Sequence, residues 1–284
     1  MTPPTVFDEI KLNALFVINH SGGKDSQAMM IKLLEFVPKE QILVVHASLG
    51  LMEWSGALEL ARDQAAAAGV DFLVAKAKKS FLDMVLRRFS ERPEVPSFPS
   101  PKYRQCTSDL KRGPITREIR RYAKANGFNR IVNCVGLRAE ESSNRAKQII
   151  FKPVAENGRA GRAWHDYLPI HSLTTNEVFQ TIKNAGQSPH WAYQDNDRLS
   201  CITCIMGSSK DLIHGAIKNP KVYALMCLIE EITGYAMHAS LRPLPDLTGI
   251  HPDYSVLDEY KDLVSKFLNT RSKRKRIPML EVAA

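Results

Sequence analysis

The feature that most constrains the fold is an apolar run that passes directly into a loop of small residues. Residues 13–19 (NALFVIN) are rich in β-formers, and the loop SGGKDS follows at residues 21–26. A helix-like run at 27–36 then begins without a linker. A buried strand that leads into a glycine loop and a helix is typical of the opening unit of a parallel α/β sheet.

The same alternation continues through most of the chain. Apolar runs at 42–46, 72–75 and 131–135 alternate with helical patterns at 54–68, 81–89 and 106–125. A short apolar element at 167–170 and a capping box from Thr174 to Glu177 follow. We therefore expect an α/β fold, a doubly wound and mostly parallel sheet, in a domain of residues 1–206.

Beyond that domain the pattern becomes helical. Apolar periodicity at 221–237 and 254–267 is separated by a turn that contains Pro243 and Pro245. It predicts a C-terminal helical appendage in residues 207–284. The basic tail at 271–276 is expected to be a solvated terminus.

Composition narrows the class of protein. The chain has 284 residues, 44% hydrophobic and 24% charged, as ordinary globular proteins do. Its longest apolar stretches are far shorter than the roughly 20 residues of a membrane helix. The N-terminus also lacks the basic start of a secretory signal, so we expect a cytoplasmic protein without membrane contact. The formal net charge of +9 favours polyanionic partners such as nucleotides or nucleic acid.

The glycine loop has the chemistry of an anion site. Gly22 and Gly23 let the backbone approach a phosphate, and amides at the start of a helix point toward it. Hydroxyls of Ser21 and Ser26 add donors, and Lys24 adds charge. The loop matches neither the Walker spacing nor G-x-G-x-x-G, which disfavours γ-phosphate hydrolysis and dinucleotide binding. A simple turn with a polar helix cap is the alternative.

Four ordered motifs carry a resemblance to a known family. The loop at 21–26 resembles the pyrophosphate loop of the ATP-pyrophosphatase (adenine nucleotide alpha hydrolase-like) superfamily. Three further segments are similar to its phosphoadenylyl-sulfate reductase branch: CTSDLK at 106–111 before Pro114, GLRAEES at 136–142 before Arg145, and CITC at 201–204. The resemblance covers about residues 13–207 and implies that ATP is held by its phosphates.

The resemblance also implies a set of site residues. Adenine would lie near residues 46–50, Mg²⁺ would accompany the phosphates, and the catalytic side chains would be Lys24, Lys111 and Arg138. A guanidinium suits this role because its planar fork can bind two phosphate oxygens. The nucleotide-binding residues would be Ser21, Gly22, Gly23, Lys24, Asp25, Ser26, His46, Arg138 and Arg145. For Arg145, an ordinary surface cation is an equal alternative.

Cysteine spacing indicates metal or redox chemistry. Cys201 and Cys204 could share one metal or one disulfide. Zinc completed by a histidine and a pair of merely buried thiols are alternatives; the candidate histidines are His165, His171 and His190. The resemblance implies that Cys106, Cys201 and Cys204 together bind a [4Fe-4S] cluster beside the nucleotide, with zinc as the competing metal.

The position of the last cysteine bears on the reaction. Sulfonucleotide reductases carry a nucleophilic cysteine in a C-terminal tail, whereas this sequence has no cysteine after Cys227. The motifs are instead similar to the ATP-pyrophosphatase component of DNA phosphorothioation systems, which acts with a cysteine desulfurase. This implies an enzyme that cleaves ATP between its α- and β-phosphates to activate a substrate for sulfur transfer. DNA is a possible partner. The alternatives are a phosphoadenylyl-sulfate or adenylyl-sulfate reductase that uses an external thiol and a non-catalytic nucleotide- or nucleic-acid-binding protein.

Overall fold

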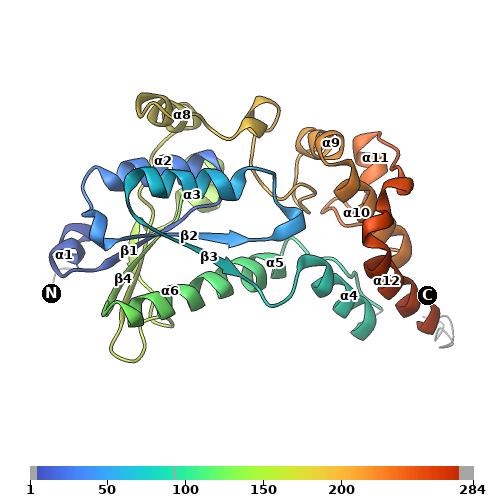
Figure 1. The fold of residues 1–284 in the computed structure, drawn as a ribbon, viewed down its shortest axis with the longest axis horizontal. Coiled ribbons are helices and arrows are strands. Elements are labelled where there is room, and N and C mark those ends of the chain that lie inside the picture. The colour runs from blue at the N-terminus through green and yellow to red at the C-terminus, as the bar shows by residue number, and fades with distance from the viewer. Residues whose placement is uncertain (1–4, 93, 275–284) are drawn as a thin grey trace. The chain divides into compact units, whose positions relative to one another are not determined.

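The computed structural model describes residues 5–92 and 94–274 and contains a six-stranded sheet, four of whose strands are labelled in Figure 1. The strands stand in the order β3-β2-β1-β4-β6-β5. All pair in parallel except β5, which is antiparallel to β6. Their bounds are β1 Leu15–Asn19, β2 Ile42–Ser48, β3 Asp71–Lys76, β4 Arg130–Cys134, β5 Phe151–Pro153 and β6 Ala163–Tyr167. The expected mostly parallel α/β sheet is confirmed.

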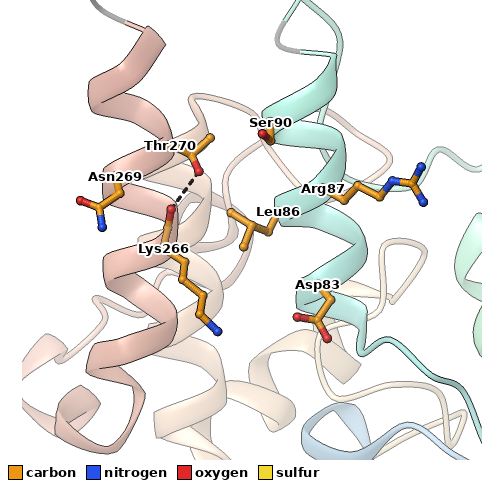
Figure 2. A pocket seen from close by; sticks show the side chains of 7 residues that line it. All are labelled: Asp83, Leu86, Arg87, Ser90, Lys266, Asn269 and Thr270. Carbon is orange, nitrogen blue, oxygen red and sulfur yellow. Dashed lines mark hydrogen bonds between the residues drawn. The ribbon is translucent and has the colours of Figure 1, made fainter.

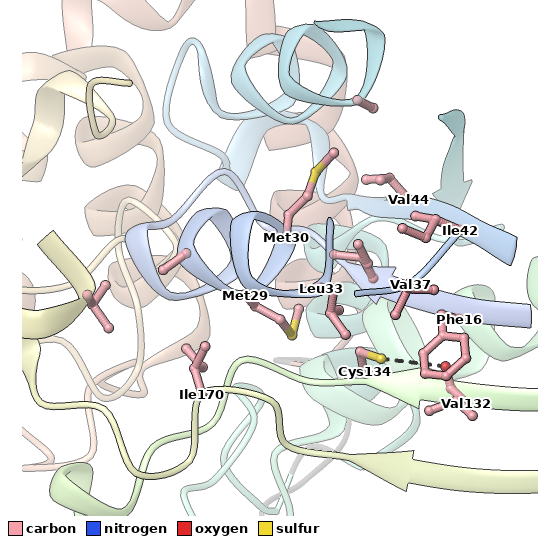
Figure 3. Close-up of a cluster of buried hydrophobic side chains, with 14 of the residues drawn as sticks. Phe16, Met29, Met30, Leu33, Val37, Ile42, Val44, Val132, Cys134 and Ile170 are labelled. Atoms are coloured by element: carbon pink, nitrogen blue, oxygen red, sulfur yellow. Dashed lines mark hydrogen bonds between the residues drawn. The ribbon is translucent and has the colours of Figure 1, made fainter. Parts of the chain in front are cut away.

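Helices cover both faces of this sheet. On one face, Phe16 and Ile18 of β1 belong to a core cluster with Met29 and Leu33 of α2 (Lys24–Leu34), part of which Figure 3 shows. Two further helices, α3 (Ala57–Ala68) and α8 (Thr175–Asn184), also contribute residues to this cluster. On the other face, α6 (Gly113–Ala125) packs a second cluster. The sheet is therefore doubly wound.

The burial of β1 explains why this strand could be predicted from the sequence. Leu15 to Ile18 are all fully buried, because alternate side chains point into the two different clusters. A strand buried on both faces reads as an unbroken apolar run rather than an alternating one. These four core residues thereby fix the position of β1 between β2 and β4. The glycine loop follows at the carboxyl end of this inner strand.

The described chain forms two compact units, and neither is continuous in sequence. The first comprises Met1–Ser48, Trp54–Ala77 and Lys111–Gln194, and it contains the whole sheet. The second comprises Leu49–Glu53, Lys78–Leu110 and Asp195–Ala284. This division does not fall at residue 206, and the domain boundary there stays a prediction.

The second unit is helical. Its elements are the 3-10 helices Gly50–Met52 and Tyr254–Tyr260 and the helices α4 Phe81–Glu91, α5 Gln105–Thr107, α9 Ser209–Lys218, α10 Pro220–Thr233, α11 Leu244–Thr248 and α12 Lys261–Arg274. The expected C-terminal helices are thus present. Of the basic tail, Lys275 and Arg276 lie outside the described residues.

Several boundaries differ from expectation. Helix α2 begins at Lys24 rather than at residue 27, so the second half of the glycine loop is already helical. Of the expected apolar element at 167–170 only Tyr167 lies in a strand, as the last residue of β6; the strand itself, with the polar sequence AWHDY, was not expected. The pattern at 254–267 is divided into a 3-10 helix and the start of α12. No helix in the described residues is both long and apolar enough to span a membrane.

A buried ion pair fixes the N-terminal helix α1 (Val6–Lys11) to the sheet. Glu9 is fully buried and accepts hydrogen bonds from Nε and Nη2 of Arg130 at 2.8 and 2.6 Å. Arg130 begins β4, so this one pair connects the helix to the strand beside β1.

We predict that Glu9→Ala lowers the free energy of unfolding by about 3 kcal/mol, because it leaves a largely covered guanidinium unpaired. Glu40→Ala, which removes an exposed carboxylate, should change it by less than about 0.5 kcal/mol. Urea denaturation of the two variants measures both values. Equal effects would contradict the structural role of the pair.

Candidate nucleotide-binding site at the glycine loop

The loop after β1 has a backbone course that only glycine permits. Gly22 has a φ of +75°, and a Cβ placed on it would lie 2.4 Å from the carbonyl oxygen of Ala57, the first residue of α3. Gly136, which follows β4, approaches the start of α2 almost as closely, with its ideal Cβ 3.1 Å from the carbonyl of Asp25. The loop is therefore enclosed by the starts of two helices and the end of β4.

Only part of the loop's backbone is satisfied internally. The amide of Ser21 donates to Oγ of Ser26 at 3.2 Å, and that of Gly22 donates to Nδ1 of His20 at 3.0 Å. The Lys24 amide donates to the hydroxyl of Tyr193 at 2.9 Å.

Within the described chain, three amides at the start of α2 have no hydrogen-bond acceptor; they belong to Gly23, Asp25 and Ser26. Such amides at a helix start attract an anion. Ser21 is exposed and Asp25 is half-buried, whereas the two glycines between them are buried.

The ammonium group of Lys24 is buried against aromatic rings. Its side chain is 5% exposed, and Nζ lies 5.1 Å from the ring centroid of Tyr193 and 5.9 Å from that of Phe179. Nζ also lies 3.3 Å from Oδ2 of Asp25. Cation–π contacts and a carboxylate stabilise this charge where water is scarce.

Arg138, expected to contact the phosphates, lies against the glycine loop. Its side chain is 4% exposed. Nε donates to Oδ1 of Asp25 at 2.7 Å, and Nη1 donates to Glu140 at 2.6 Å. Nη2 donates to the hydroxyl of Thr175 at 3.1 Å. The hydrogen bond from Arg138 is the first cause that holds the pKa of Glu140 below its usual value. Arg138 thus binds the loop through Asp25, which also contacts Lys24.

The other residues predicted to bind the nucleotide differ in their distance from the loop. His46, on β2, donates from Nδ1 to the carbonyl of His20 at 2.9 Å and so supports the residue before the loop. Arg145 forms an ion pair with Glu141 on the segment after Arg138. Lys111 is half-buried in a short π-helix, Ser108–Arg112, that precedes α6. No contact between Lys111 and the loop is present in the part of the chain that the structure describes.

His20 is a support of the loop rather than a ligand. It is 1% exposed, and Nε2 donates to Gln64 at 2.6 Å while Nδ1 accepts from Gly22. Burial lowers its pKa to about 4, so the ring is neutral at pH 7 and keeps this donor–acceptor arrangement.

Sequence reasoning did not find Tyr193 and Phe179. Both lie more than 150 positions from the loop, and no motif names them. The only signal was the density of rings in HWAY at 190–193.

The predicted metal site is not assembled. Cys106, Cys201 and Cys204 all belong to the second unit and are half-buried. Yet no group of three or more cysteine, histidine or acidic side chains is placed to hold a metal anywhere in residues 5–92 and 94–274. Three thiolates suit iron or zinc chemically, but the arrangement present here does not fit either as a preformed centre.

The histidines considered for zinc have other partners. His165 stacks on Phe151 with ring centroids 4.8 Å apart, and His171 donates to the carbonyl of Arg145 at 2.9 Å. His190 donates to the carbonyl of Ser55 at 2.9 Å. The two remaining cysteines are core residues; Cys134 is fully buried on β4, and burial raises the pKa of its thiol.

The loop that carries Cys201 and Cys204 is held firmly in its own unit. The amide of Ile202 donates to the carbonyl of Met52 at 3.0 Å. A Cβ on Gly215 of α9 would lie 2.5 Å from the carbonyl of Ile202, so helix and loop are in direct backbone contact. This packing fixes the backbone of Ile202, the residue after Cys201.

A shallow cavity of about 410 Å³ lies between α4 and α12 in the second unit (Figure 2). Two of its charged side chains have partners: Asp83 accepts from Ser80 in a capping box, and Arg87 pairs with Glu91. The capping hydrogen bonds lower the pKa of Asp83. The cavity is lined by Asp83, Leu86, Arg87, Ser90, Lys266, Asn269 and Thr270. Nothing in this mixed lining selects a ligand.

Comparison with known families matches a segment that includes parts of both units. The family model of the phosphoadenosine phosphosulfate reductase domain matches residues 16–206. The chain belongs to this family.

Two solved structures are similar at a low level. A phosphoadenylyl-sulfate (PAPS) reductase from Candida auris, in a phosphate complex, is 13% identical with a TM-score of 0.41; the match covers 63% of this chain and 76% of that one. The U34-tRNA thiolase NcsA from Methanococcus maripaludis, with its [4Fe-4S] cluster, is also 13% identical with a TM-score of 0.41. That match covers 89% of this chain and 73% of the thiolase. Likeness at this level does not bear on function. No curated protein matches the chain.

We predict that Gly22→Ala lowers the free energy of unfolding by about 2 to 4 kcal/mol, because the added methyl group meets Ala57 and the positive φ adds strain. Gly127→Ala is the matched control, since its φ of +74° is similar but nothing lies within 4 Å of the added Cβ. It should cost only about 1 kcal/mol. Urea denaturation compares the two, and equal losses would show that the contact with Ala57 is unimportant.

We predict a pH dependence of stability from His20. Its folded pKa of about 4 lies below the ordinary value of 6.5, so the unfolded chain takes up the proton first as pH falls. The contribution of His20 is complete above pH 6.5 and is lost toward pH 4, by up to about 3 kcal/mol. Urea denaturation across this range should give a shallower slope for His20→Gln than for wild type. His251→Gln, at an exposed histidine, should keep the wild-type slope; equal slopes in all three would refute the assignment.

Proposed function

We propose that the protein is an ATP pyrophosphatase, which cleaves ATP between its α- and β-phosphates to activate a substrate for sulfur transfer. The observation that carries this proposal is the set of three amides without acceptors at the start of α2, on Gly23, Asp25 and Ser26. Two buried cations lie beside this helix start, since Lys24 and Arg138 each form an ion pair with Asp25. A polyphosphate supplies the oxygens that such donors lack.

Charge in the loop is arranged to favour a departing pyrophosphate. The carboxylate of Asp25 contacts both Lys24 and Arg138, so the two cations are held beside the loop amides. When an acceptor oxygen attacks the α-phosphorus, a new P–O bond forms and the bond to the β-phosphate oxygen breaks. The negative charge that develops on the leaving pyrophosphate would be stabilised by the amides and by Lys24.

Arg138 adds positive charge beside the loop and also positions the loop. Its hydrogen bonds to Asp25 and Glu140 hold the loop to the segment after β4. Loss of its side chain would therefore remove both a positive charge and the partner that orients Asp25.

The scheme contains no step through a metal. Mg²⁺ would enter bound to the triphosphate, because no preformed cage of three acidic or other ligands exists among the described residues. A [4Fe-4S] cluster at Cys106, Cys201 and Cys204 is left out for the same reason.

For the sulfur acceptor we propose DNA, with a cysteine desulfurase as the sulfur donor. The support is the resemblance of the cysteine motifs to the phosphorothioation enzyme and the formal net charge of +9, which suits a polyanionic partner. A cytoplasmic location is proposed with it.

We predict that ATP labelled at the α-phosphate yields labelled AMP, or a labelled adenylated product, together with pyrophosphate. Arg138→Ala should slow pyrophosphate release by roughly 10²- to 10³-fold, the range for loss of one preorganised donor. Arg121→Ala, at a side chain that is 71% exposed, is the matched control and should release pyrophosphate at the wild-type rate. Thin-layer chromatography of the products measures both. Formation of labelled ADP, or an unchanged rate in Arg138→Ala, would contradict the proposal.

A sulfonucleotide reductase is the second candidate, and the matched family model favours it by its own description. It would bind a sulfonucleotide in the same loop and use an external thiol. Incubation with phosphoadenylyl sulfate, adenylyl sulfate and a thioredoxin separates the candidates, because sulfite release supports the reductase and pyrophosphate release from ATP supports the pyrophosphatase.

A further inference from the structure

A short aromatic turn, residues 190–193, lies against the start of α2. Tyr193, in the 3-10 helix Trp191–Gln194, accepts a hydrogen bond from the Lys24 amide at 2.9 Å. Its ring receives the Lys24 ammonium at 5.1 Å and packs edge-on against Phe179, with centroids 5.7 Å apart. One tyrosine therefore contacts both the backbone and the side chain of the residue at the centre of the loop.

The turn is also tied to the start of α3. Nε2 of His190 and Nε1 of Trp191 both donate to the carbonyl oxygen of Ser55 at 2.9 Å. Ser55 stands two residues before Ala57, against which Gly22 packs. The aromatic turn is thus bonded to the start of α2 through Tyr193 and to the residue before α3 through His190 and Trp191. These contacts hold Tyr193 in place.

We propose that the hydroxyl group of Tyr193 competes with the anion for the amide of Lys24, and we call this side chain the clasp. Its hydroxyl oxygen occupies the position on the Lys24 amide that a phosphate oxygen takes when the anion binds, and the clasp must open for the loop to be used in full. This inference rests on the proposed function, since it concerns the same site. The exchange is favourable because a hydrogen bond from an amide to a charged phosphate oxygen is stronger than one to a neutral hydroxyl.

The test is titration calorimetry with inorganic pyrophosphate as the probe. Tyr193→Phe keeps the ring, its contact with Phe179 and the cation–π contact, and removes only the competing oxygen. It should bind pyrophosphate about fivefold more tightly than wild type, the effect of one ordinary hydrogen bond. Tyr122→Phe is the control; it removes a hydroxyl on α6 that donates to Asp71 of β3, and it should bind as wild type does. Hydrogen exchange of the Lys24 amide should be faster in Tyr193→Phe without ligand.

Each other outcome overturns the clasp. Equal affinity of wild type and Tyr193→Phe would refute it and leave the proposed function standing. Weaker binding by Tyr193→Phe would identify the hydroxyl as a ligand of the anion rather than its competitor. Failure of both proteins to bind pyrophosphate would refute the anion site itself, and the clasp with it.

Discussion

The close contact between Gly22 and Ala57 is the constraint on which the candidate site depends. Two backbones meet there at a distance that excludes any Cβ, so the loop after β1 is pressed against the first turn of α3. Helix α2 then starts immediately, at Lys24, and its first amides stay outside the internal hydrogen-bond pattern. A larger residue at position 22 would move the loop and with it the amides of Gly23, Asp25 and Ser26.

Electrostatics around the loop have one centre, the carboxylate of Asp25. It contacts Lys24 on one oxygen and Arg138 on the other, and Arg138 continues the network to Glu140 and Thr175. Two buried cations without such partners would be costly to desolvate. The network therefore gives both cations a partner, and it ties the loop to the start of α8.

Prediction from the sequence succeeded where signals are local. The run at 13–19 and the loop after it predicted a strand, a turn and a helix in the observed order, although α2 begins at Lys24 rather than at residue 27. The strand was recognisable because a strand buried on both faces is apolar throughout. It failed for β6, since Trp164 and His165 are buried while Asp166 is a polar neighbour within a five-residue strand. Pattern rules have too few positions there to separate a strand from a loop.

Site residues divide in the same way. Arg138 was found because it belongs to a motif, and the structure adds that its donors already bind Asp25 and Glu140. Tyr193 was not found, since a contact across so long a separation leaves no trace in local spacing. The cysteines show the opposite error. The motifs predicted that Cys106 and Cys201 bind one cluster, whereas the described residues assemble no metal centre.

The central claim is that backbone amides at the start of α2 bind the outer phosphates of a nucleotide. Amide chemical shifts in a ¹⁵N–¹H spectrum of the full chain, recorded during addition of inorganic pyrophosphate, test it most directly. The account predicts large, saturable downfield shifts at Gly23, Asp25 and Ser26, since each amide gains a charged acceptor. Unchanged shifts at these three amides at millimolar pyrophosphate would contradict it.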